Sequence, residues 1–180
     1  MPIEIEKKYR LREEQRESIV ARLRELGAEL SGTEFETNTL YRSPDRDLGN
    51  AVLRLRRVDD HATLTFKKRF ASESLVKRQL EEETEVADAE ATEKILAHLG
   101  FVPSLIYEKR RQTWKFAETE ITVDELPFGW FMEIEGEEND IERVERELSI
   151  DALQAEESTY PGLTRRHGKL NGDVIEARFL

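Results

Sequence analysis

Pairs of like-charged residues, each separated by one residue, recur along several segments of this chain. The acidic pairs are Glu4/Glu6, Glu81/Glu83 and Glu133/Glu135, and the basic pairs are Arg54/Arg56 and Lys109/Arg111. Residues two apart on a β-strand point to the same face, so each pair places its two charges side by side. A solvated sheet face explains any single pair. The repetition favours an antiparallel β-barrel with a charged interior, because like charges repel unless a ligand of opposite charge lies between them.

The chemistry of the pairs indicates the ligand that such an interior would hold. Carboxylates are the preferred ligands of Mg²⁺ and also suit Mn²⁺, whereas guanidinium and ammonium groups bind phosphate oxygens. A metal-bound polyphosphate meets both needs at once. Because the chain has no cysteine, disulfides, thiolate metal sites and thiol catalysis are excluded, and a metal would be bound through oxygen.

Length and charge limit the organisation and the partners of the chain. Its 180 residues suit one domain, residues 1–180. The net charge of −11 argues against a nucleic-acid partner, which requires a basic surface that displaces counterions. The sequence contains no signal-peptide pattern and no apolar segment long enough to span a bilayer. We therefore expect a cytoplasmic protein with no membrane partner.

Hydrophobic periodicity and turn residues predict an α+β fold. We expect strands over residues 3–9, 35–41, 53–56, 63–67, 105–116, 120–125 and 130–136, and an acidic segment over residues 74–86. An apolar stripe predicts a helix over residues 12–30, Asp88 is a suitable N-cap for a helix that Gly100 ends, and a short helix covers residues 140–148. Residues 151–157 are compatible with a helix, and the rest of the last thirty residues is not assigned.

Several residues are open to a functional and to a structural interpretation. Trp114, Trp130 and Phe131 could stack on a nucleobase or a thiamine ring, but aromatic residues in strands usually pack against covering helices. The three histidines are isolated in the sequence, and we predict no histidine ligand. The alternation also has exceptions: Lys7 and Glu82 fall on the outer face, and the residues Glu108, Arg110 and Gln112 share a face with Trp114 and Phe116.

The charged segments carry a resemblance to a known family. Glu4-Ile5-Glu6-Lys7-Lys8 resembles the N-terminal ExExK signature of the CYTH superfamily, the triphosphate tunnel metalloenzymes, which include class IV adenylyl cyclases, thiamine triphosphatases and inorganic triphosphatases. The similarity continues in order through Leu53-Arg54-Leu55-Arg56, Leu64-Thr65-Phe66-Lys67, Glu81-Glu82-Glu83-Thr84, Lys109-Arg110-Arg111, Val123-Asp124 and Phe131-Met132-Glu133-Ile134-Glu135. This ordered series spans about residues 3–135 and is far more specific than ExExK alone.

The resemblance implies an eight-stranded antiparallel β-barrel, the triphosphate tunnel, and a role for each charged pair. The triphosphate-binding residues would be Arg54, Arg56, Lys67, Lys109 and Arg111. The acids that hold Mg²⁺ or Mn²⁺ would be Glu4, Glu6, Glu81, Glu83, Asp124, Glu133 and Glu135. Glu4, Glu6 and Lys8 would serve catalysis, with Lys8 near the reacting phosphates. The resemblance also makes a homodimer a candidate assembly.

Three features depart from the family pattern. The arginine that often precedes the third-motif ExE is displaced, with Lys77 and Arg78 nearby and Gln79 on the inward parity, and Glu85 adds an acid. Thr159-Tyr160 resembles the family's Ser-Tyr element, but we expect Pro161-Gly162 to interrupt the helix that usually follows.

The residues and the resemblance together predict a divalent-metal-dependent phosphoanhydride hydrolase. Its substrate would be inorganic triphosphate or an organic triphosphate, such as a nucleoside or thiamine triphosphate, attacked in line by water. One alternative is a class IV adenylyl cyclase, in which the ribose 3′-hydroxyl of ATP attacks the α-phosphorus and yields cyclic AMP and pyrophosphate. A second alternative is a non-catalytic module that binds polyphosphate or nucleotides, although the three acidic pairs speak against it.

Overall fold

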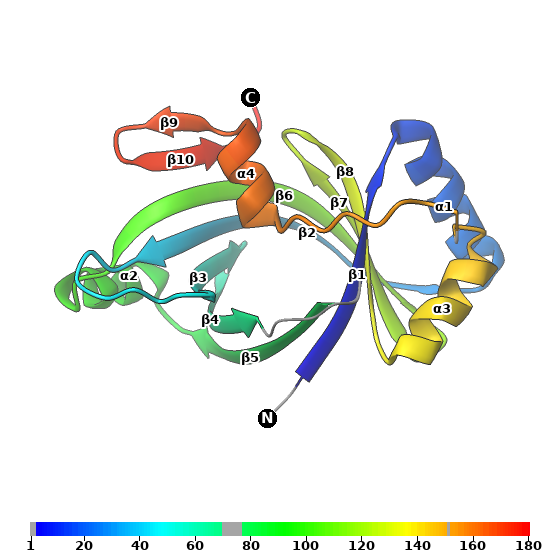
Figure 1. The fold of residues 1–180 in the computed structure, drawn as a ribbon, viewed down its shortest axis with the longest axis horizontal. Coiled ribbons are helices and arrows are strands. Elements are labelled where there is room, and N and C mark those ends of the chain that lie inside the picture. Colours follow the sequence, from blue (N-terminus) through cyan, green and yellow to red (C-terminus); the bar gives the residue numbers. More distant parts are fainter. Residues whose placement is uncertain (1–2, 70–76, 151) are drawn as a thin grey trace.

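One large β-sheet dominates the molecule (Figure 1). The computed structural model of the chain describes residues 3–69, 77–150 and 152–180, with the side chains of these except residues 3, 4, 69 and 77–79. The strands are β1 (Ile3–Leu11), β2 (Glu29–Arg42), β3 (Ala51–Val58), β4 (His61–Arg69), β5 (Lys77–Val86), β6 (Val102–Phe116), β7 (Thr119–Leu126), β8 (Gly129–Glu135), β9 (Lys169–Asn171) and β10 (Val174–Ala177). The helices are α1 (Glu13–Glu25), α2 (Ala89–His98), α3 (Glu138–Glu147) and α4 (Tyr160–His167).

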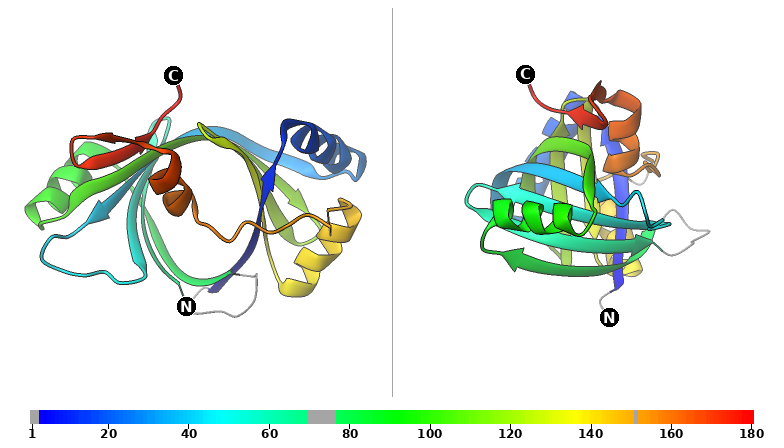
Figure 2. Two further views of the ribbon diagram at one scale, coloured as in Figure 1. Left: turned by 45° about the horizontal axis from the view of Figure 1, so that its top comes forward. Right: turned by 90° about the vertical axis from the view of Figure 1, so that its left-hand side faces the viewer.

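The strands β1 to β8 form the antiparallel sheet that the sequence predicts. Their order is β2-β3-β4-β5-β1-β8-β7-β6, and β2 also pairs with β6 along most of its length. The hydrogen-bonded order therefore returns to β2 after eight strands, and the strands curve around a central opening (Figure 2). Two short strands extend this arrangement, because β10 pairs in parallel with β6 and β9 pairs with β10. The predicted α+β class with a large antiparallel sheet is thus confirmed, and within the described residues β9 and β10 add two strands to the eight.

Helices α1 and α3 cover the outer face of the sheet at one end of the molecule (Figure 1). Tyr9 and Trp114 from the strands pack here with Leu23 of α1 and Val144 of α3, and all four are buried. These strand residues have the parity opposite to the charged pairs, as alternation requires. The interpretation of Trp114 as a packing residue is confirmed.

Two smaller apolar clusters attach the other helices. Tyr160 and Leu163 of α4 pack on Leu40, Tyr107 and Phe131, so Phe131 is also a core residue. At the opposite end of the molecule, Leu96 of α2 packs on Tyr41, Leu55 and Ala62. None of the helices in the described ranges has the length and the apolar character needed to cross a membrane.

The first helix is shorter than predicted. It ends at Glu25, and Gly27 adopts a left-handed conformation with φ of 75°. The backbone N–H of Ala28 bonds the carbonyl of Leu23, which is the hydrogen bond of a Schellman cap. The chain then enters β2 at Glu29, so Leu30 belongs to a strand and pairs with Trp114. The apolar stripe continued past a glycine that stops the helix.

The C-terminal segment differs most from the prediction. The described residues 152–158 form no helix; they cross the sheet as an irregular strap, in which Ala155 bridges to Tyr9. Pro161-Gly162 does not interrupt the following helix, because Pro161 lies in the first turn of α4, where a missing N–H costs nothing. Thr159 caps this helix by accepting a hydrogen bond from the N–H of Gly162.

Other predicted elements agree with the structure within a few residues. Asp88 caps α2 by accepting a hydrogen bond from the N–H of Ala91, and Gly100 follows the helix with a positive φ of 84°. The acidic segment contains β5, and the predicted strands β3 and β4 pair with each other as a hairpin. The departures noted at Lys77, Arg78 and Gln79 concern side chains that lie outside the described part of the structure.

Candidate active site

A cavity of about 770 Å³ lies among the inward-facing side chains of the eight strands. Its lining includes most of the site residues that the sequence predicts, namely Glu6, Lys8, Arg54, Arg56, Lys67, Glu81, Glu83, Lys109, Arg111, Glu133 and Glu135. Asp124 lies beneath the lining and is fully buried. The side chain of Glu4 is outside the described residues. The spacing of two therefore does bring the charged pairs of β3, β5, β6 and β8 to one cavity, together with Glu6 of β1 and Lys67 of β4.

Lys8 on β1 is the most enclosed cation at the β1–β8 side of the cavity. Its register partner is Glu133 on β8, and the Lys8 Nζ lies 3.0 Å from Glu133 Oε1. The same Nζ lies 3.8 Å from the centroid of the Tyr160 ring and donates a hydrogen bond to the carbonyl of Ser158. The strap and α4 thus cover Lys8, and its ammonium group is fixed in place.

The strands β3, β4 and β5 place bases beside acids. Arg54 Nη2 lies 3.7 Å from both Glu81 Oε1 and Glu83 Oε2, and Lys67 forms an ion pair with Glu81. The hydroxyl of Thr65 accepts from Arg54 and donates to Glu83. The two sets of charges that the sequence suggested are therefore not segregated. They neutralise each other across neighbouring strands.

Glu36 on β2 is a buried acid that the sequence interpretation missed. Its carboxylate has no exposed surface and lies 3.3 Å from Lys109 Nζ and 3.7 Å from both Arg56 Nε and Arg111 Nε. Asn38 also donates a hydrogen bond to it. Burial opposes ionisation, but these three cations hold the pKa of Glu36 well below its ordinary value. The fixed negative charge holds three predicted phosphate-binding bases at one point.

Asp124 on β7 is a second buried acid that holds Arg111 and Lys109 in place. Arg111 donates two hydrogen bonds to its carboxylate, at 2.8 and 2.6 Å, in a bidentate pair. The hydroxyl of Tyr160 donates to Asp124 Oδ2 at 2.7 Å, and Lys109 Nζ lies 3.4 Å from the same oxygen. The predicted metal-binding role of Asp124 remains a prediction, and in this state its oxygens are occupied by protein donors.

Lys109 is the base whose charge is most easily lost. Burial and the neighbouring Arg111 guanidinium lower the pKa of Lys109 to about 8, although Asp124 and Glu36 act in the opposite direction. The pKa of Arg111 stays above its ordinary value despite burial, because Asp124 binds its guanidinium directly. At neutral pH, both side chains are cationic and face the cavity.

A row of carboxylates crosses the opposite wall of the cavity. Glu6 on β1 is the register partner of Glu135 on β8, which is the register partner of Glu120 on β7. Like charges directly opposite each other are unfavourable unless a cation lies between them, and carboxylate oxygens suit Mg²⁺ or Mn²⁺. The donor set therefore fits a divalent metal in chemistry, although no group of three or more His, Asp or Glu side chains among the described residues is drawn together tightly enough to hold one.

Residues from the C-terminal part of the chain complete the cavity. Tyr160, Pro161 and Arg165 line it from α4, and Thr159 lines it from the N-cap of that helix. The sequence did contain a signal for Thr159 and Tyr160, namely their resemblance to the family's Ser-Tyr element. Arg165 and Glu120 carried no such signal, because neither belongs to a like-charged pair at a spacing of two.

Comparison with known proteins places the chain in a family. The model of the CYTH domain matches residues 2–160, which is most of the chain and includes every predicted site residue. The chain belongs to the CYTH family. The resemblance drawn from the charged pairs is therefore confirmed, and the ten-stranded structure matches the CYTH triphosphate tunnel fold.

Individual proteins are similar to this chain over most of their length. A Methanocaldococcus jannaschii protein named as a candidate adenylate cyclase is 26% identical over 149 residues, which cover 81% of this chain and 83% of the relative. The structure of the PH1012 protein from Pyrococcus horikoshii superposes with a TM-score of 0.74 at 25% identity, covering 87% of this chain and 96% of that one. A Hippeastrum structure, described as a candidate adenylyl cyclase with a dominant triphosphatase activity, has a TM-score of 0.71 at 19% identity and covers 96% and 98%.

Proposed function

We propose that this CYTH protein is a divalent-metal-dependent phosphoanhydride hydrolase that acts on inorganic triphosphate or on an organic triphosphate. The observation that carries the proposal is the convergence of six basic side chains of the strands on one cavity, in a chain with a net charge of −11. They are Lys8, Arg54, Arg56, Lys67, Lys109 and Arg111. A triphosphate carries about four negative charges at neutral pH and matches these bases, while a metal ion would take up the acids that pair with them.

The chain's own residues would bind and orient the phosphates. Arg54, Arg56 and Arg111 offer planar forks of donors that match phosphate oxygens. Because Glu36 and Asp124 hold Arg111 and Lys109 from behind, these bases are preorganised before the ligand arrives. Lys8, fixed under Tyr160, is placed to neutralise charge that develops on the reacting phosphoryl group.

The acidic wall would hold the metal. Glu6 and Glu135, with Glu4, Glu81, Glu83 and Glu133, are the acids that we assign to Mg²⁺ or Mn²⁺. The ion would neutralise phosphate oxygens and lower the pKa of an attacking water. The ion pairs Lys8–Glu133 and Lys67–Glu81 would separate as phosphate takes the bases and metal takes the acids.

A cyclase needs the same phosphate cradle and, in addition, contacts that hold the nucleoside. The aromatic residues in the described lining are Tyr107 and Tyr160, and both are buried by protein with at most 6% of their surface exposed. Neither offers a free ring face for stacking a base. This favours hydrolysis by water over attack by a ribose hydroxyl.

Adenylyl cyclase activity stays as the second candidate, because the Methanocaldococcus jannaschii relative is named for it. The Hippeastrum protein, which shares the fold, is described with a cyclase name and a dominant triphosphatase activity. A cyclase name within this fold is therefore compatible with a hydrolase.

The decisive experiment is product analysis with purified protein. Inorganic triphosphate, ATP and thiamine triphosphate are each incubated with Mg²⁺ or Mn²⁺, and the products are separated. We expect orthophosphate. Cyclic AMP with pyrophosphate would establish the cyclase instead, and binding without any product would establish the non-catalytic module.

Variants of the acidic wall test the metal dependence. Glu4→Gln with Glu6→Gln should lower kcat by at least about 100-fold, because each amide removes an anionic ligand. Glu82→Gln, an exposed glutamate that does not line the cavity, is the matched control. Activity that survives complete chelation of divalent ions, or that survives the double substitution, would refute the metal-dependent hydrolase.

A further inference from the structure

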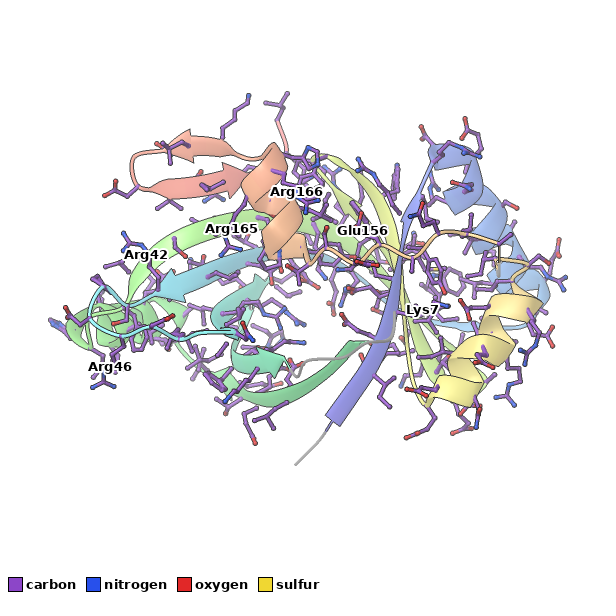
Figure 3. The ribbon with its side chains drawn as sticks, in the orientation of Figure 1. Lys7, Arg42, Arg46, Glu156, Arg165 and Arg166 are labelled. Carbon is purple, nitrogen blue, oxygen red and sulfur yellow. The ribbon has the colours of Figure 1, made fainter. Side chains whose placement is uncertain are left out.

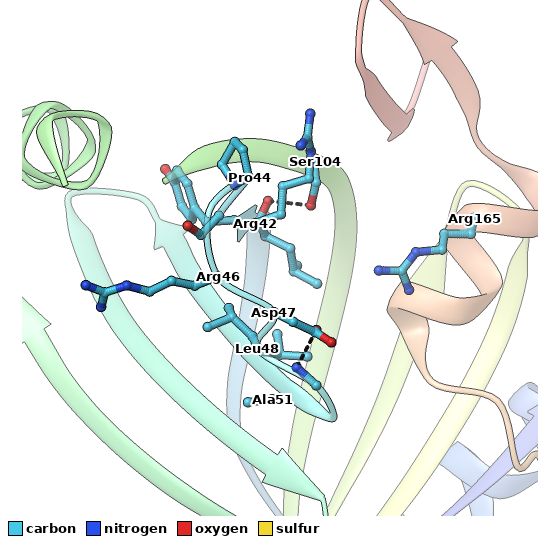
Figure 4. A pocket seen from close by; sticks show the side chains of 13 residues that line it. Arg42, Pro44, Arg46, Asp47, Leu48, Ala51, Ser104 and Arg165 are labelled. Atoms are coloured by element: carbon cyan, nitrogen blue, oxygen red, sulfur yellow. Dashed lines mark hydrogen bonds between the residues drawn. The ribbon is translucent and has the colours of Figure 1, made fainter. Parts of the chain in front are cut away.

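A second cavity, of about 410 Å³, adjoins the tunnel (Figure 4). It lies between the β2–β3 loop and α4, and its lining includes three arginines, Arg42, Arg46 and Arg165. Figure 3 places Arg42 and Arg46 around the β2–β3 loop and Arg165 on α4. We call this cavity the arginine subsite. Nothing in the family resemblance assigns a role to these three residues.

The two cavities are neighbours. They share five lining residues, Leu40, Gly49, Ala51, Val52 and Arg165. Arg165 therefore faces both, and Figure 4 shows it extending from α4 toward the loop that carries Asp47. The arginine subsite therefore borders the cavity that would hold the triphosphate.

The arginines of the subsite differ from the bases of the tunnel in their partners. Each tunnel base lies within 4.0 Å of a carboxylate, for example Lys109 beside Glu36. The side chains of Arg42, Arg46 and Arg165 make no hydrogen bond or ion pair with any residue in the described ranges. All three side chains are exposed and line one cavity, so they add positive charge there in a protein of net charge −11. In Figure 4, Arg165 extends toward the β2–β3 loop, whereas Arg46 extends away from Arg165.

The remaining lining of the subsite narrows the class of ligand. Asp47 is its acid, and one oxygen of Asp47 accepts a hydrogen bond at 2.8 Å from the N–H of Gly49. Tyr41 is its aromatic residue, but it is buried, and its hydroxyl donates to Glu93. A nucleobase would find no free ring face here, whereas a phosphate group would find guanidinium donors of matching geometry.

We propose that the arginine subsite binds a phosphate group beyond the triphosphate, so that the preferred substrate carries at least one phosphate more than the tunnel holds. This rests on the proposed function, because the tunnel must first hold the triphosphate. The additional phosphate has two sources, a longer linear inorganic polyphosphate or a phosphate on an organic moiety. The shared chemistry is a phosphate monoanion or dianion at the end of an extended polyanion.

Equilibrium binding to the full chain tests the proposal without turnover. Titration calorimetry in the presence of a chelator would use inorganic triphosphate, inorganic tetraphosphate, ATP and adenosine 3′-phosphate 5′-triphosphate. We expect tetraphosphate to bind about tenfold more tightly than triphosphate, as one additional charge-assisted contact provides. If the phosphate is organic, the 3′-phosphorylated nucleotide should instead exceed ATP by a similar factor.

Two sets of variants locate the effect. Arg42→Gln with Arg46→Gln, and separately Arg165→Gln, should lower the preference for the longer ligand about tenfold, as measured by the ratio of the two Kd values. Arg166→Gln is the matched control, because Arg166 is the exposed neighbour on α4 and lines neither cavity. It should leave the ratio unchanged.

The outcomes separate this proposal from the function on which it rests. If neither longer ligand is preferred, or if the subsite variants weaken triphosphate and the longer ligand equally, the subsite proposal is wrong while the tunnel assignment stands. If no polyphosphate binds at all, the proposed function fails first. Binding with preserved preference but no hydrolysis would retain the subsite and reject the hydrolase.

Discussion

Glu36 and Asp124 determine how three bases of the cavity, Arg56, Lys109 and Arg111, are held. Both carboxylates are fully buried, and between them they contact Lys109, Arg111 and Arg56. A buried ion pair gains little net stability, because removing two charges from water costs nearly as much as their attraction returns. We infer that these acids are kept for geometry. They fix the bases that would bind phosphate, at some cost to the free energy of folding.

Lys109 gives the first prediction at this scale. Because burial and Arg111 lower its pKa to about 8, Lys109 loses its charge as the pH rises from 7 to 9. Triphosphate binding should weaken about tenfold over this range, in proportion to the charged fraction. The free energy of unfolding should instead rise with pH. Between pH 8 and the ordinary lysine pKa, Lys109 holds its proton in the unfolded chain more than in the folded protein, and stability rises with pH wherever the unfolded chain binds more protons.

A lysine-to-arginine change isolates this effect. Lys109→Arg keeps the positive charge at every pH in the range, so calorimetric titration of the variant should show no decline between pH 7 and 9. Circular dichroism would confirm that the variant folds. An equal decline in the variant and the parent would mean that another group titrates, and the lowered pKa of Lys109 would then not control binding.

At the scale of elements, α4 is positioned by a close approach that only glycine permits. A Cβ on Gly168 would lie 2.6 Å from the carbonyl oxygen of Thr164 and 2.9 Å from that of Glu176. Both atoms are backbone, one in α4 and the other in β10, so neither can rotate away. Gly168 thus lets the end of α4 lie directly against β10, and α4 in turn carries Tyr160 and Arg165 to the cavity.

Substituting this glycine gives the prediction for the element. Gly168→Ala should lower the free energy of unfolding by about 1–3 kcal/mol, because α4 must move away from β10. Urea denaturation measures the change. Gly32→Ala is the control, since its added Cβ would meet only Glu34 Oε1, at 3.9 Å. A loss of stability as large in the control as in Gly168→Ala would show that the crowding is not the cause.

The element scale also shows where sequence reasoning succeeds. Strict alternation predicted the inward face of β1, β3, β5, β6 and β8, because period two alone determines which side chains share a face. The assignment of helix boundaries failed at two places. An apolar stripe continued past Gly27 to Leu30, and Pro161, which lies in the first turn of α4, was interpreted as a helix breaker. In both cases the capping chemistry, not the hydrophobic pattern, set the boundary.

At the scale of the whole molecule, the strand order could not be derived from the residues alone. The pairing of β2 with β6 joins segments about seventy residues apart, and it brings Glu36 beside Lys109. No local pattern encodes that neighbourhood, so the buried acid was missed, and so were Arg165 and the arginine subsite. The family resemblance supplied the tunnel, whereas the mutual neutralisation of acids and bases emerged only from the register of neighbouring strands.

This neutralised interior leads to a prediction for the entire fold. A ligand that binds only the folded chain stabilises it by about 2.7 kcal/mol at a concentration of 100 times Kd. For a domain of this size, that corresponds to a rise in Tm of about 5–10 °C. Inorganic triphosphate at 100 times its Kd should produce this shift in differential scanning calorimetry. Sodium chloride at the same ionic strength should not, because screening acts weakly on enclosed charges and offers no polyanion to the six bases. A chloride shift equal to that of triphosphate would mean that relief of surface repulsion, rather than occupation of the tunnel, stabilises the protein.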